Sequence, residues 1–380
     1  MATLHQLTPR VARLAVPPSG PYSKHASNLY LIGSQSAKTR LLIDTGNGHL
    51  DTSPSLKQFT INHVILTHAH GGHSNGLLAL NIDPSTPLSK FKSKGDSAQN
   101  VRDKGKTGDL RFVKNGDVIV LKEKDGVDST LEVIHTPGHS GDSISLWLKE
   151  EQCLFSGDAI SSTPFTPSTT ATTATSTTPT ISNPSHQLIE NLSDYTTTLK
   201  RLSSLGPRII LPGHGDVITN GLEYIDTAQT VLSKTSKTIL TLIQHHHAIN
   251  AFQITQYLLV NGLSANTLDI PKTNAGAYNV VLEGTVKLHL LELEKRGLVK
   301  RVFAAKDDTQ NVSEAQKNQR GPGGLTYSTI FDAVKSSRQR DWAEKKESDG
   351  ADVTAFRVRE QVHPAHLWIG LSNQVGWTAV

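Results

Sequence analysis

The sequence predicts an α/β fold followed by a helical C-terminal region. Short apolar segments between residues 10 and 211 end in glycine-containing turns that carry histidine or aspartate, as expected for buried strands with functional side chains at their ends. Leucines at helical spacing follow in residues 188–202, and three further helical segments and a strand follow in residues 235–303. These observations favour an α/β domain with a second, mainly helical domain behind it.

The elements are expected in a definite order. Apolar runs predict strands at residues 10–16, 29–32, 40–43, 64–66, 118–121, 131–135, 144–148, 153–155 and 208–211. Helical spacing predicts helices at 188–202, 235–247, 251–260 and 279–296. Gly297 suits the C-cap of the last helix, and residues 298–303 resemble a strand. Three helices and then a strand is a winged-helix-like order.

The chain therefore divides into three predicted parts. Residues 1–223 form the α/β domain, with a low-complexity insertion at 161–185 that is rich in threonine and serine. Residues 224–305 form the winged-helix-like domain. Residues 306–380 are a polar tail, which we expect to be partly mobile.

Composition excludes several classes of protein. Of 380 residues, 36% are hydrophobic and 19% are charged, which excludes a disordered chain, a coiled coil and a collagen-like fibre. No apolar run reaches the roughly 20 residues that span a bilayer, so no membrane partner is expected. The net charge of +4 permits anion binding without requiring it. Cys153 is the only cysteine, so a thiolate zinc site cannot form.

The N-terminal composition bears on localisation. No acidic residue precedes Asp44, although several basic residues do. This is typical of a mitochondrial presequence, but residues 10–16 also fit a first strand. We expect a cytoplasmic protein, with a mitochondrial one as the alternative. The oligomeric state is not indicated by the sequence.

Histidines at the expected strand ends predict a metal site. His68, His70 and His73 lie within six residues directly after a strand. His139, Asp158 and His214 each lie in a glycine-containing turn after a later strand. Imidazole and carboxylate groups suit borderline ions, so the sequence predicts a site for one or two Zn²⁺ ions.

Together these ordered motifs resemble the metallo-β-lactamase superfamily, in its glyoxalase II-like branch. The resemblance covers about residues 10–220 and implies an αββα sandwich with metals at the sheet edges. It implies a first metal on His68, His70 and His139, and a second on His73 and His214, with Asp158 bridging both. Asp158 and His73 are also the candidate catalytic residues. Asp44 would orient a ligand histidine by a hydrogen bond.

Gly72 departs from the family pattern, which has an aspartate ligand at that position. The first zinc would then be held firmly and the second weakly. Three interpretations stay open: an enzyme with a single metal, an enzyme in which a nearby acid such as Asp142 substitutes, or a degenerate pseudoenzyme.

The C-terminal helix at 286–297 and the segments at 8–14 and 28–33 resemble one subgroup of the family. It contains fungal lactamase-like thioesterases, which release polyketides from carrier proteins, and the animal mitochondrial lactamase-like endoribonuclease. We expect a zinc-dependent hydrolase of an acyl thioester, either small or bound to a carrier protein. Cleavage of single-stranded RNA is the alternative. A steep salt dependence of RNA affinity would favour the alternative.

Overall fold

The structure is a computed structural model of the chain. It describes residues 4–16, 27–48, 53–93 except 78, 81, 82 and 84, 110–162 except 124, 125 and 127, 189–246, 249–260, 275–303 and 375–379. Most of the expected insertion at 161–185 and of the expected polar tail lies outside the described residues. Contacts divide the chain into two units, residues 1–238 with 267–292, and residues 239–266 with 293–380.

The first unit contains a seven-stranded sheet whose spatial order follows the chain. Its strands are β1 (Leu4–Gln6), β2 (Val11–Val16), β3 (Ser27–Ile32), β4 (Thr39–Ile43), β5 (Thr60–Ile65), β6 (Leu88–Phe91) and β7 (Leu110–Val113). Pairing is antiparallel from β1 to β4 and parallel from β4 to β7. The parallel strands β4 and β5 therefore end at the same edge of the sheet.

A second, five-stranded sheet has the order β12-β11-β10-β9-β8. Its strands are β8 (Val118–Leu121), β9 (Ser129–His135), β10 (Ile144–Leu148), β11 (Cys153–Gly157) and β12 (Ile209–Pro212). Only β11 and β12 pair in parallel. Both strands therefore end at one edge, where Gly157 is the last residue of β11 and Gly213 directly follows β12.

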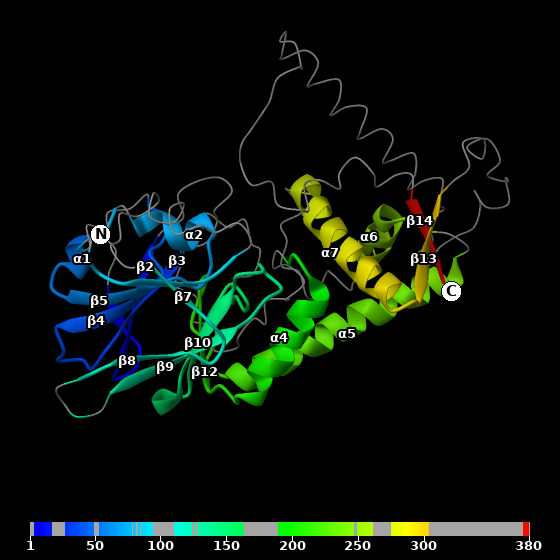
Figure 1. The fold of residues 1–380 in the computed structure, drawn as a ribbon. Coiled ribbons are helices and arrows are strands. Elements are labelled where there is room, and N and C mark those ends of the chain that lie inside the picture. The colour runs from blue at the N-terminus through cyan, green and yellow to red at the C-terminus, as the bar shows by residue number, and fades with distance from the viewer. Residues whose placement is uncertain are drawn as a thin grey trace, which may run out of the picture. The chain divides into compact units, whose positions relative to one another are not determined.

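The two sheets pack face to face, with helices outside them (Figure 1). The central core joins side chains of both sheets, such as Ile43 and Leu146. The outer face of the first sheet packs against α1 (Ser53–Leu56) and the turn after α2 (Gly71–Ser74). The outer face of the second packs against α4 (Leu192–Ser204) and α5 (Gly221–His245). These four layers confirm the predicted αββα sandwich.

Two parts of this unit differ from the sequence prediction. Strands β6 and β7 were not expected, because polar residues interrupt both of them and Lys90 of β6 is nevertheless buried. Helix α5 begins at Gly221, fourteen residues before the predicted start at 235. Its first turns bury Ile225, Ala228 and Leu232, whose helical spacing could have revealed them.

The second unit contains α6 (Ala251–Val260) and a two-stranded antiparallel sheet of β13 (Val299–Phe303) and β14 (Val375–Ala379). Helix α7 (Ala275–Lys295) belongs to both units, and Gly297 follows it with a positive φ of 71°, as a C-cap requires. Trp377 of β14 is buried and pairs with Ile249. The winged-helix-like assignment and the domain boundaries stay predictions. Among the described residues, no helix has the length and apolar character needed to cross a membrane.

Candidate metal centre

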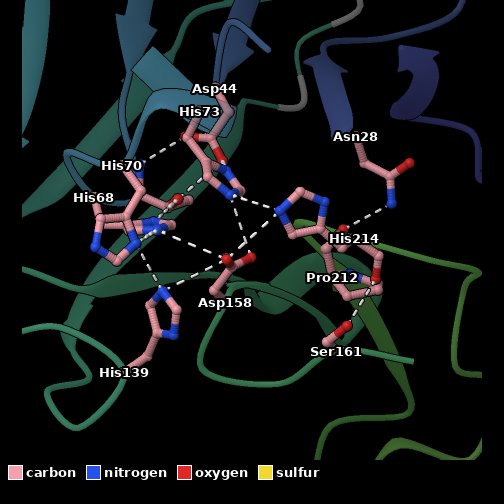
Figure 2. A network of polar contacts seen from close by, with 12 residues as sticks. Asn28, Asp44, His68, His70, His73, His139, Asp158, Ser161, Pro212 and His214 are labelled. Atoms are coloured by element: carbon pink, nitrogen blue, oxygen red, sulfur yellow. Dashed lines mark hydrogen bonds and ion pairs between the residues drawn. The ribbon is translucent and has the colours of Figure 1, made fainter. Parts of the chain in front are cut away.

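The strand ends bring together all seven predicted site residues. Asp44 follows β4, the three histidines of residues 68–73 follow β5, and His139 follows β9. Asp158 and His214 follow the parallel strands β11 and β12. Figure 2 shows the imidazoles directed toward Asp158, which lies between His68, His70 and His139 on one side and His73 and His214 on the other.

The first group consists of His68, His70 and His139. Nδ1 of His70 lies 3.1 Å from Nε2 of His68 and 2.9 Å from Nε2 of His139. Ligands at about 2.1 Å around a tetrahedral ion are roughly 3.4 Å apart. The three nitrogens therefore have close to the spacing that a common cation would impose, and they form one of the groups able to hold a metal ion.

The second group consists of His73, His214 and Asp158. Nε2 of His73 lies 3.2 Å from Nε2 of His214 and 3.2 Å from Oδ1 of Asp158. Oδ2 of Asp158 lies 3.5 Å from Nε2 of His214 and also 3.5 Å from Nε2 of His139. The two carboxylate oxygens thus face both groups, which is the arrangement of a bridging ligand.

Burial and charge set the protonation of these side chains. Burial lowers the pKa of His68 well below its usual value and that of His70 to about 4. Both imidazoles are therefore neutral near pH 7 and have a nitrogen lone pair available for a cation. Burial alone would raise the pKa of Asp158, but His214 and the other imidazoles hold it well below its usual range. An ionised carboxylate among imidazole nitrogens is a donor set that fits a divalent cation.

Asp44 fixes the orientation of two of these imidazoles. Its Oδ2 lies 2.8 Å from Nδ1 of His73 and accepts a 2.8 Å hydrogen bond from Oγ1 of Thr67. That hydroxyl also lies 3.1 Å from Nδ1 of His68. His68 can thus donate from Nδ1 and direct its unprotonated Nε2 into the site. Burial alone would lower the pKa of His73, but Asp158 and Asp44 raise it to about 10, so Nε2 of His73 has to lose a proton before it binds a cation. Sequence reasoning missed Thr67, although it directly precedes His68.

Gly213 holds the last turn close to the site. A Cβ at this position would lie 2.6 Å from Cε1 of His73 and 2.7 Å from Oδ1 of Asp158. Asn28 of β3 anchors the same turn, because its side chain donates to the carbonyl oxygens of Pro212 and Gly215 at 2.9 and 2.8 Å (Figure 2). Asn28 was also missed, since only the fold brings it to residues almost 200 positions away.

Gly72 leaves space in the second group. A Cβ there would lie 3.5 Å from Oγ of Ser27 and 3.6 Å from Nε2 of His214, which are ordinary contacts. Asp142, considered above as a substitute acid, accepts a hydrogen bond from Ser140 and lies 3.5 Å from Nζ of Lys90. Its carboxylate therefore interacts with these two residues, and a role of Asp142 in the second group stays a prediction.

Sequence comparison agrees with the fold and the donor set. The sequence profile of the metallo-beta-lactamase superfamily matches residues 23–214. The chain therefore belongs to the metallo-beta-lactamase superfamily. The matched region includes every residue of both metal-binding groups.

Several curated proteins are similar to the chain. Beta-lactamase-like protein 2 homolog of Caenorhabditis elegans is 27% identical over 305 residues, which are 78% of this chain and 88% of that protein. An atrochrysone carboxyl ACP thioesterase of Paecilomyces divaricatus is 29% identical over 224 residues, 57% of this chain and 59% of that protein. The chain thus spans about three fifths of the thioesterase's length.

A solved structure supports the fold. A beta-lactamase domain protein from Burkholderia ambifaria superposes with a TM-score of 0.55 and 16% identity, over 79% of this chain and 90% of that one. At this identity the likeness concerns the fold alone.

Proposed function

We propose that the chain is a zinc-dependent hydrolase of acyl thioesters, including acyl groups bound to a carrier protein. The observation that carries this proposal is the convergence of five imidazoles on Asp158, in two groups that share its carboxylate. The group of His68, His70 and His139 supplies three imidazoles, which suits hydrolysis better than a structural role, because a structural zinc site is usually closed by four protein ligands and a catalytic one keeps a position open.

His68, His70 and His139 would hold the first zinc ion, and His73, His214 and Asp158 the second. A zinc ion bound here would polarise the substrate carbonyl and lower the pKa of a water molecule so that it can attack. The buried first group offers neutral imidazoles, so no proton has to leave His68 or His70 before a cation binds.

Asp158 and His73 are the proposed catalytic residues. Oδ2 of Asp158 lies 3.5 Å from nitrogens of both groups, where a carboxylate can accept a hydrogen bond from the attacking water and orient it. His73 is held between two acids, with Nδ1 2.8 Å from Asp44 and Nε2 3.2 Å from Asp158. This fixes the imidazole and keeps Nε2 directed toward the carboxylate.

The relatives support the thioester as substrate. Several similar fungal proteins are named atrochrysone carboxyl ACP thioesterases, at 27–30% identity. Because the chain spans about three fifths of their length, the carrier-bound acyl group is a proposal for this chain. The experiment must distinguish thioester hydrolysis from two alternatives, cleavage of single-stranded RNA and a chain without activity.

The test compares two substrates at two salt concentrations. The zinc-loaded chain should hydrolyse a chromogenic acyl thioester and an acyl-carrier protein, and turnover should persist at high salt. Chelation should abolish turnover, and added zinc should restore it. RNA cleavage that falls steeply with salt, without thioester turnover, would contradict the proposal. Metal-loaded protein that is inactive on both substrates would identify a pseudoenzyme.

A further inference from the structure

Ser27 is held directly beside the second group. It begins β3 and forms an antiparallel bridge with His214. The next residue, Asn28, donates its backbone N–H to the carbonyl oxygen of Gly213 at 2.8 Å. Because backbone bonds on this segment tie it to the turn that carries His214, the position of Ser27 relative to His214 is fixed by the main chain and not by a mobile side chain.

The hydroxyl of Ser27 is buried. The residue is 1% exposed, and its Oγ has no hydrogen-bond partner among the residues that the structure describes. Leaving a buried hydroxyl without a hydrogen bond is destabilising. A bound ion that accepts the lone pair of this oxygen would account for the unsatisfied hydroxyl.

Gly72 shows what this hydroxyl faces. A Cβ at position 72 would lie 3.5 Å from Oγ of Ser27 and 3.6 Å from Nε2 of His214. The hydroxyl oxygen and the imidazole nitrogen thus border the same space, which Gly72 leaves free of a side chain. The second group has only three protein donors, and zinc usually takes four ligands.

We propose that Oγ of Ser27 is the fourth protein donor of the second cation site. Ser27 completes a set of two nitrogens and two oxygens with His73, His214 and Asp158. A neutral hydroxyl is a weaker ligand than a carboxylate, so the second site binds more weakly than the first but is still formed. Gly72 is compatible with such a site because the donor comes from β3 instead of from the 68–73 turn.

The experiment is a cobalt titration of the metal-free full-length chain, followed by visible absorption. Two equivalents should bind, the second more weakly. Ser27→Ala should lower the affinity for the second equivalent by at least about tenfold, which is the smallest effect usual for loss of a group that supports a metal site. The affinity for the first equivalent should not change. Ser129→Ala is the matched control, because Ser129 is equally buried but bonds to Glu123; it should bind both equivalents normally.

Two further variants give positive signals. Ser27→Cys should produce a thiolate-to-cobalt absorption band that grows with the second equivalent only. Gly72→Asp should make Ser27 dispensable, so Gly72→Asp with Ser27→Ala should recover tight second binding. A wild-type chain that binds one equivalent, a Ser27→Ala titration that superimposes on the wild type, or a Ser27→Cys chain without the band would each overturn the inference.

These results are separable from the proposed function, on whose second cation site the inference rests. If the chain fails to hydrolyse thioesters but its second cobalt equivalent depends on Ser27, the inference stands and the substrate assignment falls. If the chain hydrolyses thioesters but Ser27→Ala does not change the affinity for the second cobalt equivalent, the substrate assignment stands and the inference falls.

Discussion

Asp44 and His73 form the buried pair that organises the centre, with Oδ2 of Asp44 2.8 Å from Nδ1 of His73. Asp44 has a positive φ of 59°, a conformation that aspartate tolerates better than most residues. The turn after β4 thereby aims the carboxylate at the 68–73 turn. Through Thr67, the same carboxylate also sets the orientation of His68.

Replacing Asp44 should therefore weaken metal binding without removing a proposed ligand. In Asp44→Asn, the amide can present its NH₂ group to His73 and no longer fixes the Nδ1–H form. We expect cobalt affinity to fall about 10- to 100-fold, measured by titration of the metal-free chain. Asp83→Asn is the control, because the exposed carboxylate of Asp83 accepts hydrogen bonds from Ser85 in a turn that is separate from the site. Equal affinities of the two variants would contradict the role of Asp44.

His139 and His135 provide a matched test of the first group. His139→Ala removes one of three converging nitrogens, so the first metal equivalent should be lost and hydrolysis should fall by at least about 100-fold. His135 lies four residues earlier and stacks on Phe91 instead. His135→Ala should keep its metal content, measured by mass spectrometry of the protein-bound metal. A metal content that falls equally in both variants would indicate general damage to the hairpin.

Gly138 should be required for stability, because it allows the turn before His139 to contact α4. Its φ is 136°, and a Cβ there would lie 2.5 Å from Cα of Tyr195. We expect Gly138→Ala to lower the free energy of unfolding by more than about 2 kcal/mol. At Gly141 a Cβ would meet no atom of a described residue within 4 Å. Gly141→Ala should therefore change the free energy of unfolding by less than about 1 kcal/mol. Similar denaturation midpoints for the two variants would refute this.

His289 should make the protein sensitive to acid. Burial lowers the pKa of this α7 histidine to about 4, and its Nδ1 lies 2.7 Å from Oγ of Ser236. The unfolded chain, with a pKa near 6.5, binds the proton more readily, so stability should fall as pH decreases from 6.5 to 4. The loss should total roughly 3 kcal/mol at the lower end.

His289→Leu should flatten this acid limb, measured by denaturant unfolding between pH 7 and 4. The comparison is between the slopes of the two proteins with pH, so a uniform change in stability from the substitution does not affect it. An unchanged slope in the variant would show that other groups cause the acid sensitivity.

The donor residues of the metal centre could be predicted from the sequence, but the residues packed around them could not. Each predicted donor follows a strand with an apolar run, such as β12 (Ile209–Pro212), which was predicted at 208–211 and precedes His214. Strand β6 could not be predicted, because the burial of Lys90 depends on Asp142 from a distant turn. The environment of Ser27 likewise depends on the approach of the His214 turn, which no local pattern encodes.

The most direct test of the account is a crystal structure of the zinc-loaded chain, with anomalous data collected at the zinc absorption edge. The account predicts a strong peak in contact with Nε2 of His68, Nδ1 of His70 and Nε2 of His139, and a weaker one beside His73, His214 and Asp158. A map with zinc bound elsewhere, and no peak among these three nitrogens, would contradict it.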